Sequence, residues 1–105
     1  MPRKKRPEKS SARTAKTGLV MRLYVASNAP NSLLAIANLT AICNEFLQGN
    51  FKLEVVDVLE EPLRALADGI LVTPSLAKLS PSPTTHIVGN LGDKKSVLQA
   101  LGIKG

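Results

Sequence analysis

Hydrophobic and polar positions change their period along the chain, and each period predicts an element. Residues 19–26 (LVMRLYVA) are apolar on both alternating faces, which is typical of a central strand covered on both sides. From about residue 31 to 48 the apolar positions follow a helical period, with Pro30 in the first turn and Gly49 at the end. The face of that helix expected in the core carries Ser32, Ala35, Ile36, Leu39, Ile42, Cys43 and Phe46.

The remaining chain predicts three more strands, one of them from an ambiguous apolar run, together with a short helix and a last helix. Residues 51–59 alternate at first and then become apolar on both sides, so we expect a strand buried towards its end. A short helix follows Pro62. The run 70–79 has no period that separates helix from strand, and we place it as a strand before a second one at 86–89. The last helix runs from Asp93, a plausible N-cap, to about residue 101.

This order, βαβαββα, predicts a thioredoxin-like α/β fold. One helix links the first two strands, so they should lie parallel with a right-handed crossover. Ser27 or Asn28, in the turn LYVASNAPNS, offers a side-chain oxygen near the helix start. A thioredoxin-type enzyme carries two cysteines in that turn, and this chain has none there. Pro74 follows Thr73 where thioredoxin-like folds place a cis-proline.

Charge divides the chain into a basic tail, residues 1–17, and a neutral domain, residues 18–105. The tail holds seven basic residues and one acid, while the rest holds seven of each, so the net charge of +6 belongs to the tail. The tail has no large apolar residue after Met1, so we expect it to be disordered. It can serve as a solubilising segment or bind nucleic acid nonspecifically. Because no apolar run suits a signal peptide or a membrane span, we expect a cytoplasmic protein without a membrane partner.

The single cysteine restricts the possible chemistry. Cys43 excludes an internal disulfide and a CxxC pair, and with His86 as the only histidine no metal cluster is expected. A Cys/His nucleophile pair remains an alternative, but the helical phase places Cys43 on the core face. We therefore expect no catalytic residue, no metal and no cofactor.

Four ordered segments of the chain resemble the KaiB family of circadian clock proteins. They are LYVASNAPNS (23–32), LEVVDVLEEP (53–62), ILVTPSLAKLSPSP (70–83) and IVGNLGDKKSVLQAL (87–101), and together the resemblance covers nearly all of 21–101. It implies a non-enzymatic protein that binds the RecA-like ATPase KaiC and alters its phosphorylation cycle. It also implies two folds, a tetrameric ground state of βαββααβ order and a thioredoxin-like monomer that binds.

We expect two groups of functional residues. The candidate partner-binding positions are Asn28, Pro30, Asn31, Leu34, Ala37, Ala41, Lys52 and Glu54. Of these, Leu34, Ala37 and Ala41 lie opposite the core face of the first helix, where they can form an apolar contact patch. The candidate fold-switch positions are Pro74, Pro81, Pro83, Gly89 and Asp93. The expected partners are a KaiC-like ATPase and, in the ground state, further copies of the chain in a dimer or tetramer.

Departures from the family pattern keep alternatives open. Family members often have glycine where Ser27 stands, and basic residues where Leu34, Ala37 and Glu54 stand. The acidic C-terminal tail common in cyanobacterial members is missing. The chain resembles a divergent member that serves a clock or a stress pathway. One competing function is that of a thioredoxin-like thiol protein, which needs an accessible thiolate. The other is that of a basic-tailed nucleic-acid-associated protein. The domain is neutral and the chain has only three aromatic residues for base stacking, and both features disfavour this second function.

Overall fold

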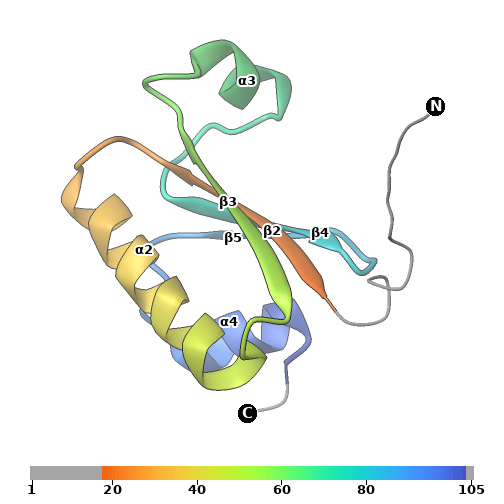
Figure 1. Ribbon diagram of the computed structural model, residues 1–105. Coiled ribbons are helices and arrows are strands. Elements are labelled where there is room, and N and C mark those ends of the chain that lie inside the picture. Colours follow the sequence, from red (N-terminus) through yellow and green to blue (C-terminus); the bar gives the residue numbers. More distant parts are fainter. Residues whose placement is uncertain (1–17, 104–105) are drawn as a thin grey trace.

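A computed structural model describes residues 18–103 and confirms the predicted order βαβαββα. The elements are β2 (Leu19–Val25), α2 (Pro30–Ile42) with its π-helical extension η1 (Cys43–Leu47), β3 (Phe51–Asp57), α3 (Pro62–Ala67), β4 (Ser75–Ser80), β5 (Thr85–Val88) and α4 (Lys94–Leu101). The four strands form one sheet in the order β3-β2-β4-β5 (Figure 1). β2 and β3 are parallel, as their linking helix predicts, and the other neighbours are antiparallel.

The core lies between one face of the sheet and the helices α2 and α4, which Figure 1 shows side by side. Leu23, Leu39 and Leu76 are fully buried there. The predicted core face of α2 is confirmed: Ser32, Ala35, Leu39, Ile42 and Cys43 are buried, and Ile36 and Phe46 pack half-buried against the core. The predicted basic tail, residues 1–17, lies outside the described residues.

The prediction that Ser27 or Asn28 caps α2 with its side chain is wrong. The N-cap residue is Ala29, and no side chain caps the helix. Ser27 adopts a positive φ of 44° and donates its hydroxyl to Asp57 Oδ2 at 2.8 Å, because a carboxylate is a stronger acceptor than a neutral group. The turn is instead closed by Ser32, whose Oγ accepts the Ala26 N–H at 2.9 Å.

The expected covering of β2 on both faces is only partly correct. Met21, Leu23 and Val25 point into the core, whereas Val20 and Arg22 on the other face are half-buried. The reason is that the short α3 is the helix on that side, and it lies at the end of the sheet (Figure 1). The face that carries Val20 and Arg22 is called the open face below.

Strand boundaries in the second half also differ from the expectation. The apolar run 70–79 becomes a strand only from Ser75, and residues 70–74 form an irregular segment that precedes it. β5 ends at Val88, because Gly89 has a φ of 119° and leaves the strand conformation. β3 ends at Asp57, where a turn begins. The Thr73–Pro74, Ser80–Pro81 and Ser82–Pro83 peptide bonds are cis.

Candidate functional site

The turn after β2 is held by Asp57, the last residue of the neighbouring strand. Its Oδ1 accepts the N–H groups of Ser27 at 3.1 Å and Leu59 at 2.9 Å, and its Oδ2 accepts the Ser27 hydroxyl. These bonds, first the one from Leu59 and then those from Ser27, hold the pKa of Asp57 below its ordinary value of 3.8. These bonds therefore hold the turn after β2, where a thioredoxin carries its cysteines, against the loop that follows β3.

The exposed side of α2 carries most of the expected partner-binding residues. Asn31, Leu34, Ala37 and Ala41 are all exposed along it, and Asn28 and Pro30 are exposed at its beginning. No residue of α2 is charged. Leu33, which the sequence reasoning missed, is as exposed as Leu34. This side of α2 can therefore make contacts that depend on shape and apolar area and not on charge.

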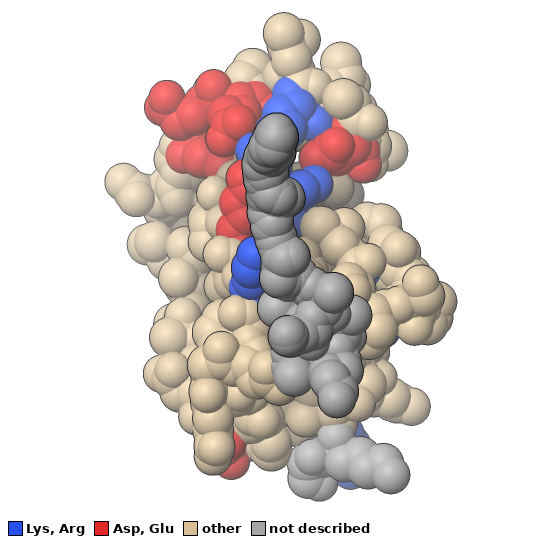
Figure 2. Space-filling model, turned by 45° about the vertical axis from the view of Figure 1, so that its right-hand side comes forward, with Lys and Arg blue, Asp and Glu red and all other residues tan. Residues whose placement is uncertain are grey.

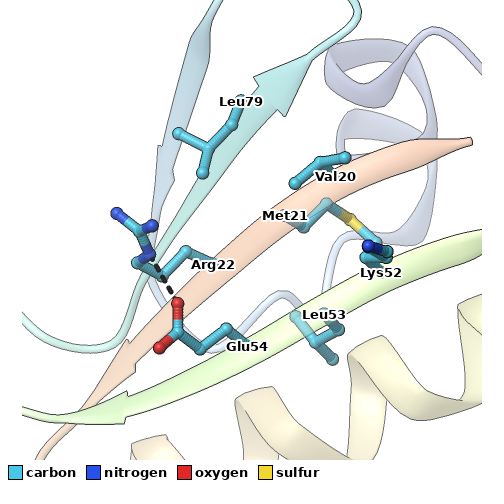
Figure 3. A pocket seen from close by; sticks show the side chains of 7 residues that line it. All are labelled: Val20, Met21, Arg22, Lys52, Leu53, Glu54 and Leu79. Atoms are coloured by element: carbon cyan, nitrogen blue, oxygen red, sulfur yellow. Dashed lines mark hydrogen bonds and ion pairs between the residues drawn. The ribbon is translucent and has the colours of Figure 1, made fainter. Parts of the chain in front are cut away.

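Lys52 and Glu54 do not join that surface. Both point to the open face, on the other side of the sheet from α2, where they line a hollow of about 460 Å³ (Figure 3). The other lining residues are Val20, Met21, Arg22, Leu53 and Leu79. The structure thus separates the expected partner-binding residues into two groups on opposite faces.

Glu54 belongs to a set of charged side chains, here called the charged network, that links α3 to the sheet. Its Oε1 accepts hydrogen bonds from Arg22 Nε at 3.0 Å and from Arg64 Nη2 at 2.6 Å. The Arg64 and Arg22 guanidinium groups lower the pKa of Glu54. Arg64, on α3, also pairs with Glu61 at 3.4 Å.

Asp68, directly after α3, completes the charged network. It pairs with Arg22 at 3.4 Å and accepts a hydrogen bond from the Tyr24 hydroxyl. Burial and this bond raise the pKa of Tyr24. The sequence signal for this network is Arg22, the one charged residue in an otherwise apolar strand. Because a half-buried guanidinium is costly without a partner, its presence predicts a carboxylate nearby.

The expected fold-switch positions fall into three places. Pro74 is buried, and its carbonyl oxygen accepts the Gly89 N–H at 3.0 Å, so these two lie together. Pro81 and Pro83 are exposed in the connection from β4 to β5. Asp93 caps α4 as expected: Oδ1 accepts the Ser96 N–H at 3.3 Å, and its pKa is lowered by the two bonds from Ser96.

The Cys43 thiol is buried, with 2% of the residue exposed, and burial raises its pKa. This is the opposite of the environment that activates a thiolate. Within residues 18–103, no three His, Cys, Asp or Glu side chains gather as metal ligands would. No helix in that part of the chain has the length and apolar character needed to cross a membrane.

The fold and the cysteine-free turn define the class: a thioredoxin-like protein without the redox pair. Solved structures of similar fold include the N-terminal domain of SasA from Synechococcus elongatus, with a TM-score of 0.67, 22% identity, and coverage of 93% of this chain and 92% of that one. Chloroplastic thioredoxin z has a TM-score of 0.70 and 19% identity, over 83% of this chain and 78% of that one.

Sequence relatives narrow the class to a family. The KaiB domain matches residues 22–103. The circadian clock oscillator protein KaiB of Microcystis aeruginosa is 46% identical over 84 residues, which cover 80% of this chain and 81% of that protein. KaiB1 of Synechocystis is 45% identical, over 80% of each chain. The chain belongs to the KaiB family.

Proposed function

We propose that this protein is a non-enzymatic regulator that binds a KaiC-type RecA-like ATPase and modulates its phosphorylation cycle. The observation that carries the proposal is the match of the KaiB domain to residues 22–103, which spans every described element except the start of β2. The cysteine-free turn and the buried Cys43 thiol support a binding role over a thiol-redox role. The relatives are named clock oscillator proteins, which agrees with regulation of a partner.

The exposed, uncharged side of α2 is the first surface that we assign to this binding, together with the turn that precedes it. Asn28, Pro30 and Asn31 present the beginning of the helix, and Leu34 and Ala37 continue the surface. Apolar side chains exposed in a group on a small domain are often contact sites. The proposal further includes a cytoplasmic location, a homo-oligomer and a second arrangement of βαββααβ order in exchange with the one described.

The direct test is a pull-down with the KaiC-type ATPase of the same organism, with and without ATP. The protein should capture the ATPase in at least one nucleotide state, and Leu34→Lys should weaken the capture because it buries a charge in an uncharged contact. Leu79→Lys, on the open face, is the matched control. If neither nucleotide state gives capture at concentrations well above those in the cell, the proposal is wrong.

A further inference from the structure

Six large aliphatic residues are exposed at the end of the molecule that carries α3. They are between 53% and 89% exposed and are here called the apolar end: Leu59, Leu63, Leu66, Leu71, Val72 and Val88. None of them is among the partner-binding positions expected from the sequence. Single exposed aliphatic residues are normal, but a group of this size on so small a domain indicates a contact surface.

Several of these side chains surround a common hollow of about 230 Å³. Ile70, Leu71, Val72 and Val88 line it together with Asp68, Gly69, Ser75 and His86. Two hydrogen bonds join α3 to the same segment, from Gly69 N–H to the Leu66 carbonyl at 3.0 Å and from Ile70 N–H to the Ala65 carbonyl at 2.9 Å. α3 therefore leads directly into the segment that lines the hollow, and the hollow has room for one partner side chain.

The apolar end is bordered by negative charge. Between Asp57 and Asp68 the chain has four carboxylates, at 57, 60, 61 and 68, and one guanidinium, that of Arg64. Arg64 is paired with Glu54 and Glu61, and Asp68 is paired with Arg22. Figure 2 shows uncharged atoms at the upper end of the molecule, with acidic residues below them on both sides and basic residues between the two acidic groups. A partner surface that fits would be apolar in its centre and basic around it.

Two other occupants fit this surface poorly. A second copy placed symmetrically on the apolar end would bring the two acidic borders together, and like charges at an interface are unfavourable. The basic tail of the chain has the right charge, but it has no large apolar residue after Met1 to fill the centre.

We infer that the apolar end is a docking surface for an apolar patch flanked by Lys and Arg on the partner ATPase. This inference rests on the proposed function, because it takes the KaiC-type ATPase as the partner. It adds a second contact region, beside α2, and states the chemistry of the surface it recognises. The apolar centre supplies affinity, while the acidic border makes the association rate and part of the affinity depend on salt.

Binding of the purified ATPase, measured by calorimetry at low and high salt, tests the inference. The variants are Leu63→Asn with Leu66→Asn on α3, Leu71→Ser in the irregular segment before β4, and Glu60→Lys on the acidic border. Leu79→Asn on the open face is the control for loss of an exposed leucine. Leu71 lies outside every helix and strand, so its variant should fold even if the α3 variant does not. Heteronuclear NMR spectra establish that each variant is folded.

We expect the α3 and Leu71 variants to lose about tenfold or more in affinity, as residues central to an interface do, and the control to bind as the wild type. Glu60→Lys should weaken binding at low salt and reduce its salt dependence. If the wild type binds and the leucine variants bind equally well, the inference is wrong while the proposed function stands. If the wild type does not bind, both fail. A wild-type dimer in sedimentation that Leu71→Ser abolishes would overturn the inference in favour of a second copy.

Discussion

At the scale of single residues, the position of Cys43 indicates a structural role for its thiol and not a redox role. Its thiol lies in the core with a raised pKa, in the same cluster as buried residues of α2 such as Leu39. A small buried group of this kind contributes to packing, and its reactivity is suppressed.

Cys43→Ala should lower the free energy of unfolding by about 1–2 kcal/mol, because it removes a small buried group. Binding of the ATPase should not change. Denaturant titration measures the first effect, and thiol labelling of the native protein gives an independent check. Labelling as fast as that of a free thiol would contradict the buried position.

The ionisation of Asp57 should make the free energy of unfolding depend on pH. Its pKa in the folded protein lies below the ordinary value of 3.8, so the charged form is favoured by folding. The stabilisation is complete above the unfolded value and is lost as the pH falls through the folded value. We therefore expect the free energy of unfolding to fall below about pH 5, and Asp57→Asn to reduce that decrease. Denaturant titrations between about pH 2 and 6 measure it, and equal slopes for both proteins would exclude Asp57 as a cause.

At the scale of elements, α3 depends on its tertiary contacts. It has six residues, far fewer than an isolated helix needs to be stable in water. Two charged contacts tie it to the sheet: Arg64 binds Glu54 on β3, and Asp68 binds Arg22 and Tyr24 on β2. Because exposed ion pairs contribute little individually, the network should affect local order more than global stability.

Glu54→Gln should therefore speed amide hydrogen exchange in α3 while the melting temperature changes little. Glu54 accepts from Arg64 of α3 and from Arg22 of β2, so its neutral variant weakens the Arg64 link directly and leaves the Asp68 contacts in place. Glu45→Gln, which removes the surface pair with Lys94, is the control and should leave α3 unaffected. Amide hydrogen exchange measured by mass spectrometry tests this prediction. If α3 in Glu54→Gln were as protected as in the wild type, the charged network would not hold α3 in place.

Gly89 tests the proposed second arrangement of the chain. Its φ is 119°, a conformation that side chains disfavour, while an added Cβ would meet no atom within 4 Å. Gly89→Ala should thus destabilise the arrangement described here through its backbone alone. If a βαββααβ form coexists, the populations should move towards it, and a difference of about 1.4 kcal/mol changes the ratio tenfold. Two slowly exchanging sets of NMR signals would report the ratio, and one set for both proteins at all temperatures would contradict the exchange.

The hydrophobic pattern predicted the element order and the core face of α2, because both depend on local periodicity. It did not predict where β4 begins, since the mostly apolar run from Ile70 to Leu79 has no period that marks a strand start and only tertiary pairing assigns Ser75 to the sheet. The helix cap was mispredicted because Asp57, thirty residues away, binds the Ser27 hydroxyl. The apolar end was missed for the same reason: Leu71 and Val88 are distant in sequence and line one hollow only in the fold.

At the scale of the whole molecule, the helices are distributed unevenly around the sheet. α2 and α4 cover one face and build the core, while among residues 18–103 the helix on the other face is α3, at one end (Figure 1). This arrangement leaves an uncharged helix surface on one side and an apolar end with an acidic border on another. These two surfaces and the buried thiol are the features on which the proposed binding of a larger partner rests.

The measurement closest to the central claim is the phosphorylation state of the KaiC-type ATPase over time, with and without this protein. The wild type should change the phosphorylated fraction or its rate of change. Cys43→Ala should have the same effect, and Leu34→Lys a reduced one. If the phosphorylation of the ATPase followed the same course at every ratio of the two proteins, this protein would not regulate it.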